Sequence, residues 1–236
     1  MPKREVCDEL LDAVPDEPRW IEARALVLSG DCGVFGGAGG WVLRNEQPGG
    51  RLVVLVGRPS PAVLDEALSG RPGSEVLTAP EDEEANAAQL PGWSRERAVL
   101  HELADPARLA PDDGTVRALT PEDSLAHLPA ALREEMEGAL SRHAVHAAFE
   151  ADVAASFAYA CWRTETRFDM SIDTAPWFRR RGLARRAASA LIRAEADAGR
   201  RPVWGAMASN EASLRLAEAL GFRAVDEIAC FSAPNF

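Results

Sequence analysis

The most constraining feature of this 236-residue sequence is a single strand–loop–helix unit in its last third. Residues 168–174 alternate apolar and polar side chains, which is the period of a half-buried β-strand. The next nine residues, Pro176 to Ala184, read Pro-Trp-Phe-Arg-Arg-Arg-Gly-Leu-Ala. An apolar stripe at helical spacing then runs through Leu183, Ala187, Leu191 and Ala194. The chain is therefore expected to pass from a strand into a helix through a loop with three consecutive arginines.

This arginine run stands at the amino end of a helix, where cations oppose the helix dipole. Arg179, Arg180 and Arg181 precede the helix, and Arg185 and Arg186 fall in its first turn. The unpaired amides of a helix start stabilise a bound anion, and a glycine within the loop leaves those amides accessible. The pattern predicts a diphosphate site. A solvated helix start and a nucleic-acid patch are the alternatives.

Composition limits the alternatives. A formal net charge of −11 and a pI near 4.9 argue against sequence-independent nucleic-acid binding, which needs a basic surface. No apolar run approaches the roughly 20 residues that span a bilayer, and the first residues lack the apolar core of a signal peptide. The four cysteines form no C-x-x-C pair. We expect a cytoplasmic protein without metal, membrane or nucleic-acid partners.

The first half of the chain reads as a small α/β region. Its expected elements are a tight turn between short strands in the glycine-rich segment 30–40, a strand at 51–57, a helix at 60–68, a strand at 75–78 and a helix start at 79–86. Turn residues at 109–114 mark a linker. The sequence therefore predicts an amino-terminal domain, 1–113, and a second domain, 114–236.

The second half also mixes strands and helices. Its expected elements are a strand at 115–119, a helix from Thr120 to about His143, antiparallel strands within 147–175, a strand at 202–207 and a helix that Asn210 caps and Gly221 ends. The helix start at Thr120 rests on a capping residue followed by Pro121 and two acids.

Several of these residues resemble the signatures of the GNAT N-acetyltransferases. Arg179, Gly182 and Ala184 match the family's Arg/Gln-x-x-Gly-x-Gly/Ala loop, and Pro176 matches the proline that often precedes it. An asparagine before a helix that ends in Leu-Gly-Phe recurs as Asn210 and 220–222. The resemblance covers about half of the chain. It implies an α/β (α+β) fold with a central mixed, mostly antiparallel sheet flanked by helices, preceded here by the smaller α/β domain.

Some further residues resemble the branch of this family that includes the zwittermicin-resistance acetyltransferases, which also carries an extra amino-terminal α/β region. These are Ile172-Asp173-Thr174, 181–184, Trp204 and residues between Asn210 and Glu218.

The resemblance implies acetyl-CoA as the acyl donor and places its binding site. The pantetheine arm would pair with the strand at Ile172, Asp173 and Thr174. The diphosphate would bind at the loop and helix start, formed by Arg179, Arg180, Arg181, Gly182, Leu183 and Ala184. Asn210 would contact the cofactor's arm, serve as a helix cap, or do both.

The implied activity is transfer of an acetyl group to a primary amine of a small molecule by direct attack. Such an amine has a pKa of about 10.4 and must lose a proton first. Candidate bases are Asp173 and Asp169 on the polar face of the strand, and Glu150 near the preceding turn. For each of them an ion pair with a nearby arginine is the structural alternative. The acceptor's identity and the choice between monomer and homodimer stay open.

The chain departs from the family at one catalytic position. The family often has a tyrosine on the last helix that reprotonates the thiolate, and this chain has Ala217 there. Tyr159 is the only tyrosine and is expected to pack in the core. A coenzyme A-binding regulatory module with decayed catalysis is therefore the alternative function.

Overall fold

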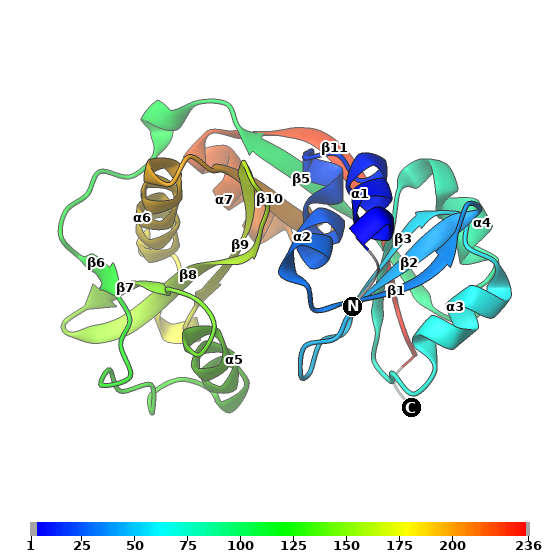
Figure 1. Ribbon diagram of the computed structural model, residues 1–236. Coiled ribbons are helices and arrows are strands. Elements are labelled where there is room, and N and C mark those ends of the chain that lie inside the picture. Colours follow the sequence, from blue (N-terminus) through cyan, green and yellow to red (C-terminus); the bar gives the residue numbers. More distant parts are fainter. Residues whose placement is uncertain (1–3, 235–236) are drawn as a thin grey trace. The chain divides into compact units, whose positions relative to one another are not determined.

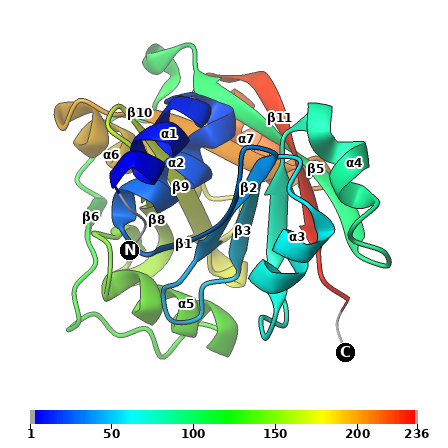
Figure 2. The same cartoon turned by 45° about the vertical axis from the view of Figure 1, so that its right-hand side comes forward.

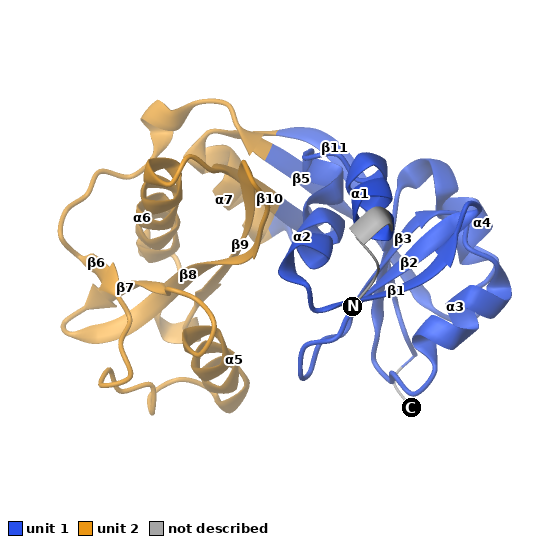
Figure 3. Ribbon diagram, viewed as in Figure 1, with its two compact units in different colours: residues 1–101, 205–211, 224–236 blue, residues 102–204, 212–223 orange. Residues whose placement is uncertain are grey.

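The computed structural model describes residues 4–234, which form two compact units (Figure 3). The first unit takes in the chain up to His101, residues 205–211 and the stretch from Ala224 onward. The second unit comprises 102–204 and 212–223. Four elements, β5, β10, α7 and β11, contain residues of both units. None of the helices in the described part of the chain is long and apolar enough to cross a membrane.

The first unit contains the strand order β1-β2-β3-β4-β11-β5 (Figures 1 and 2). Its elements are α1 (Arg4–Ala13), η1 (Pro18–Trp20), α2 (Ile21–Ser29), β1 (Cys32–Gly37), β2 (Gly40–Asn45), β3 (Leu52–Gly57), α3 (Pro61–Leu68), β4 (Glu75–Thr78), η2 (Pro80–Asp82), α4 (Glu83–Ala87), β5 (Ser94–Leu103) and most of β11 (Phe222–Ser232). Leu64 of α3 packs with Val53, Leu55 and Val76 in one apolar core. The glycine-rich segment forms the expected tight hairpin between β1 and β2.

The second unit contains the strand order β10-β9-β8-β7-β6. Its elements are η3 (Pro106–Arg108), β6 (Val116–Ala118), α5 (Ala130–Leu140), β7 (His146–Glu150), β8 (Val153–Arg163), β9 (Arg167–Thr174), η4 (Pro176–Phe178), α6 (Leu183–Asp197), β10 (Arg201–Met207) and α7 (Glu211–Leu220). Strands β6 to β9 pair antiparallel, and β9 pairs parallel with β10. The mixed, mostly antiparallel sheet with flanking helices confirms the expected fold class.

Two helices cover the two faces of β7–β9 (Figure 1). Helix α5 shares a core with Phe157 and the ring of Tyr159 on β8. Helix α6 buries Leu183, Ala187 and Leu191, as the expected stripe requires. This arrangement leaves the loop before α6 at the end of β9.

The expected stripe is wrong at its last member. Ala194 is exposed, and the neighbouring Glu195 is buried instead. Arg163 donates from Nη2 to Glu195 Oε1 at 2.7 Å, and Arg200 donates from Nε to Glu195 Oε2 at 2.6 Å. Burial alone would raise the pKa of Glu195, but these two guanidinium groups lower it.

The prediction that a helix begins at Thr120 is also wrong, because the regular helix α5 begins only at Ala130. Asp123 makes a local turn instead. Its Oδ2 accepts hydrogen bonds from the Thr120 amide at 2.8 Å and the Thr120 hydroxyl at 3.0 Å. Both Nη atoms of Arg117 donate to the same carboxylate. The backbone makes only isolated turns here, from Asp123 to Thr120 and from Leu128 to Leu125, so the segment stays irregular up to α5.

The same order of elements occurs twice along the chain. The series α2, β1, β2, β3, α3, β4, α4, β5 is followed by the series α5, β7, β8, β9, α6, β10, α7, β11. Each series places three antiparallel strands before a helix, then a strand parallel to the third one. The loop after β3 is thus the counterpart in sequence order of the loop after β9.

Strand β11 was not expected from the sequence, and it bears on the proposed division at residue 113. It lies between β4 and β5, and its pairing with β4 runs from Ala229↔Thr78 to Ser232↔Glu75. The expected linker residues 109–114 lie in the second unit. The division into 1–113 and 114–236 stays a prediction.

We expect residues 1–113 alone not to fold stably, because without β11 both β4 and β5 would have an unpaired edge. Circular dichroism and thermal melting of that fragment measure this. Refolding together with residues 114–236 should restore a cooperative transition. A cooperative melt of 1–113 alone would show that β11 is dispensable for the first unit.

Candidate functional site

The loop between β9 and α6 has an unusual backbone. After Thr174 the chain passes through a buried Ala175 and the short helix η4. Arg180 then takes a left-handed conformation, with φ of +62°, although it is not a glycine. Gly182, the residue before α6, is also left-handed, with φ of +77°. Left-handed residues in a loop tend to mark functional sites, because the conformation costs energy for ordinary residues.

This loop leaves the first amides of α6 free. The amide of Arg186 is the first to donate within the helix, to the Gly182 carbonyl at 3.2 Å. Within residues 4–234, the amides of Leu183, Ala184 and Arg185 donate no backbone hydrogen bond. A Cβ placed on Gly182 would meet no atom within 4 Å, so the space beside Gly182 is open. Free amides, open space and a helix dipole together form a cradle for an anion.

The arginines of this segment divide into two groups. Arg185 and Arg186 have structural partners: Arg185 Nη2 donates to the Arg108 carbonyl at 2.5 Å, and Arg186 forms an ion pair with Asp113 at 3.4 Å. Arg179, Arg180 and Arg181 are exposed at the loop. These three can therefore turn toward an anion at the cradle without loss of a buried contact.

One edge of β9 is open beside this loop. Strand β10 pairs with β9 only at three positions, which end at Val203↔Asp169. Strand β8 pairs with β9 as far as Ser156↔Thr174. Among the described residues, no strand pairs with the other edge of β9 from Met170 to Thr174. Backbone groups along that edge can therefore accept an extended ligand as an added strand.

The three predicted bases lie in different surroundings. Asp169 stands where the pairing of β9 with β10 ends. Asp173 is four residues further on the same face, which is about 13 Å away along a strand. Glu150 lies at the end of β7, and its Oε1 accepts a hydrogen bond from Arg181 Nη1 at 2.5 Å. Only one of the two aspartates can therefore act on a given nitrogen. Glu150 forms an ion pair with an arginine, which was the structural alternative to its role as a base.

Asp173 belongs to a polar cluster that the sequence did not indicate. The Tyr159 hydroxyl donates to Glu135 Oε1 at 3.1 Å. The Ser171 hydroxyl lies 3.5 Å from Asp173 Oδ2. Tyr159 and Ser171 are cross-strand partners in the pairing of β8 with β9. Residues from α5, β8 and β9 thus meet beside the open edge of β9.

Burial and charge alter the titration of this cluster. Desolvation raises the pKa of Glu135, and the nearby charge of Asp173 raises it further. Desolvation also raises the pKa of Tyr159, so its hydroxyl stays protonated at neutral pH. His143 stacks on the Tyr159 ring with centroids 5.6 Å apart, and burial lowers its pKa.

The two remaining sequence-selected residues lie on or next to α7. Asn210 directly precedes α7 and is exposed. It belongs to the first unit, unlike the loop at Gly182. Ala217 is fully buried in α7. A hydroxyl cannot be supplied from the Ala217 position.

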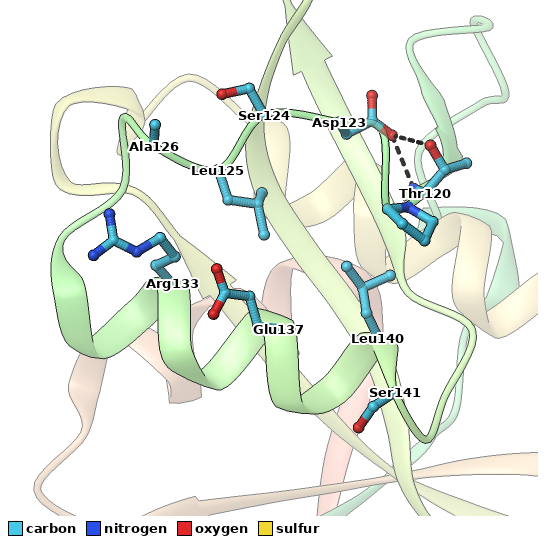
Figure 4. Close-up of a pocket in the computed structure, with 10 residues that line it drawn as sticks. Thr120, Asp123, Ser124, Leu125, Ala126, Arg133, Glu137, Leu140 and Ser141 are labelled. Atoms are coloured by element: carbon cyan, nitrogen blue, oxygen red, sulfur yellow. Dashed lines mark hydrogen bonds between the residues drawn. The ribbon is translucent and has the colours of Figure 1, made fainter.

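The irregular segment before α5 leaves a separate hollow of about 690 Å³ (Figure 4). Leu125 extends from the segment toward α5, and Arg133 and Glu137 project from the side of α5 that faces it. None of the sequence-predicted site residues lines this hollow. It exists because residues 120–129 do not form the expected helix.

A known protein family matches the part of the chain that contains this loop. Residues 146–231 match the model of the GNAT acetyltransferase family, and this segment contains β9, the cradle and α7. This segment of the chain is similar to the GNAT acetyltransferases. No curated protein matches the sequence significantly. The zwittermicin-resistance branch stays a prediction.

Solved structures share the fold over nearly the whole chain. A GCN5-related N-acetyltransferase-like protein from Streptococcus suis is 16% identical, covers 97% of this chain and 98% of its own, and has a TM-score of 0.65. A GCN5-related N-acetyltransferase from Kribbella flavida is 12% identical, with 92% and 95% covered and a TM-score of 0.64. A tandem GNAT protein from the clavulanic acid biosynthesis pathway is 13% identical, with 98% and 96% covered and a TM-score of 0.60. At these identities the likeness shows the fold.

The loop before α6 can accommodate a diphosphate by its own geometry. The open space before Gly182, the free amides of α6 and the exposed arginines are all on one short segment. The structure brings Ile172, Asp173 and Thr174 to the open edge that leads into that segment.

Sequence reasoning missed Glu135 and gave Tyr159 only a packing role. Glu135 is one of three glutamates within four residues of α5, and nothing local distinguishes it from Glu134 or Glu137. The usable signal was Tyr159, a single tyrosine at an inward-facing strand position, whose hydroxyl needs a partner when buried.

The Glu150–Arg181 contact generates a test of the Glu150 role. Both side chains are largely exposed, at 38% and 50%, so the pair is worth at most about 1 kcal/mol. We expect Glu150→Gln to release Arg181 and tighten coenzyme A binding by up to about fivefold, as measured by calorimetry. Unchanged affinity together with lost turnover would instead assign Glu150 as the base.

Proposed function

We propose that this protein is an N-acyltransferase of the GNAT type that transfers an acetyl group from acetyl-CoA to a primary amine of a small molecule. The observation that carries the proposal is the cradle at Gly182, where free amides and three exposed arginines lie at the end of an open strand edge. A diphosphate at that position would place an extended pantetheine arm along Ile172, Asp173 and Thr174.

Different residues of the chain would then bind the diphosphate, neutralise its charge and orient the pantetheine arm. The amides of Leu183, Ala184 and Arg185 bind the diphosphate, and Arg179, Arg180 and Arg181 neutralise its charge. The edge of β9 orients the arm, so that the thioester carbonyl supplied by the bound cofactor lies near the face that carries Asp173. Direct attack by an amine needs no covalent intermediate on the protein.

Asp173 is the base that this geometry favours. Removing a proton from an ordinary ammonium group at neutral pH costs about 4–5 kcal/mol. Asp173 lies on the open part of β9, whereas Asp169 lies where β10 still pairs. Glu150 is held by Arg181. We therefore assign proton removal to Asp173, directly or through one water molecule.

A coenzyme A-binding regulatory module is the second candidate, and Ala217 favours it. The position where the resembling family often has a tyrosine is a buried alanine. If no other group protonates the thiolate, the chain would bind the cofactor without efficient turnover. Mass spectrometry of the protein with acetyl-CoA and pooled amines separates the candidates, since only the first predicts a mass gain on an acceptor.

The corresponding loop of the first unit is unsuited to a diphosphate. It reads Gly57-Arg58-Pro59-Ser60-Pro61, and its two prolines remove two amide donors. Its single arginine, Arg58, donates from Nε to Asp82 Oδ1 at 2.7 Å. We propose that this loop of the first unit holds no diphosphate.

We expect Gly182→Glu to abolish coenzyme A binding in calorimetry, because the new carboxylate would occupy the open space and repel the diphosphate. Gly199→Glu is the matched control. Gly199 ends the same helix, is exposed, has φ of +79° and has no atom within 4 Å of a Cβ. Both substitutions impose a similar strain of about 1–2 kcal/mol. Wild-type affinity of the Gly182 variant would refute the role of the cradle.

A further inference from the structure

The hollow between residues 120–129 and α5 has no part in the proposed chemistry. Its volume of about 690 Å³ falls within the range of roughly 300–1,000 Å³ that small-molecule sites occupy. We infer that it binds a zwitterion of dipeptide size with apolar side chains, whose carboxylate pairs with Arg133 and whose ammonium group pairs with Glu137. None of the described residues that line the hollow belongs to β9 or to the loop before α6, so a ligand there would leave the proposed cofactor site free.

Arg133 and Glu137 supply opposite charges that have no partner in the protein. Both project from the side of α5 that faces the irregular segment (Figure 4). Within residues 4–234, neither side chain takes part in an ion pair or a hydrogen bond. Charged side chains four residues apart on a helix can pair with each other, but arginine before glutamate is the less favourable order, because it opposes the helix dipole. Each charge is therefore available to a ligand.

Other polar groups of the lining already have partners. The carboxylate of Asp123 accepts hydrogen bonds from Arg117 and Thr120. The hydroxyl of Ser141 donates to the Gly138 carbonyl at 2.7 Å. The charges of the described lining that lack a partner are thus one cation and one anion. A ligand with a single charge would satisfy only one of them, whereas a zwitterion satisfies both.

Leu125 and Leu140 form the apolar part of the lining. Leu125 is buried and extends from the irregular segment toward α5 (Figure 4). Leu140 is half-buried and packs against the same core as Leu125. Apolar side chains on the ligand would cover these two leucines, whereas polar ones would lose water there without a compensating hydrogen bond. The lining therefore favours an apolar zwitterion over a polar one.

Three matched probes test the two charges separately: leucyl-leucine, its N-acetyl derivative and its carboxamide. Nitrogen-15 NMR titration of the full chain measures both the affinity and the position of binding. We expect leucyl-leucine to bind with a dissociation constant on the order of 1 mM or below, and to shift the amide signals of residues 120–126 and 133–141. The N-acetyl derivative lacks the ammonium group and the carboxamide lacks the carboxylate, so each should bind about tenfold more weakly.

Two substitutions should remove this discrimination one charge at a time. Arg133→Met is expected to weaken leucyl-leucine binding about tenfold and to abolish its advantage over the carboxamide. Glu137→Met is expected to weaken it to a similar extent and to abolish its advantage over the N-acetyl derivative. Glu134→Gln is the control, because Glu134 is exposed on the same helix and does not line the hollow. It should bind all three probes as the unsubstituted protein does.

The inference would be overturned by equal affinity for the three probes, by the absence of saturable binding in the millimolar range, or by shifts confined to residues outside 120–141. Retained discrimination in both methionine variants would also overturn it. Gly182→Glu should bind leucyl-leucine with unchanged affinity, because Gly182 does not line the hollow. Failure of the cofactor cradle and failure of this second site are therefore separate results.

Discussion

The start of α6 is the constraint on which the account of this protein depends. A helix that begins after a left-handed glycine presents amides that its own backbone cannot satisfy. Here five arginines surround that end. Arg185 and Arg186 contact Arg108 and Asp113, whereas Arg181 pairs with Glu150 at the surface. Such a concentration of positive charge at the positive end of a helix is unfavourable by itself. A doubly charged anion bound there would offset this repulsion, which is the physical reason for proposing a ligand at this end of α6.

The two series of elements differ in the composition of one loop. Both series run from a third strand through a loop into a helix. After β9 the loop keeps its amide donors and exposed arginines, whereas after β3 two prolines remove donors and Asp82 holds the single arginine. The shared fold therefore does not imply a shared function, which follows from the side chains of each loop.

The sequence predicted the fold class and most elements because local patterns determine them. The stripe of α6, the β-branched run of β3 and the glycines of the first hairpin each act over a few residues. Strand β11 could not be predicted, because its partner β4 is about 150 residues away and the pairing depends on the folded chain. The prediction of a helix from Thr120 was wrong for another reason. The acids after Pro121 match a helix start, but Asp123 makes a single turn and pairs with Arg117. At the site, the loop was visible in sequence, whereas the contact of Glu135 with Tyr159 arises only when α5 packs on β8.

The most direct test of the central claim is a crystal structure of the full chain grown with coenzyme A. The account predicts the diphosphate within hydrogen-bond distance of the amides of Leu183, Ala184 and Arg185, with Arg181 turned from Glu150 toward it. It also predicts the pantetheine arm along β9 from Ile172 to Thr174. A cofactor bound elsewhere, with the amides before α6 left in contact with solvent, would contradict the account.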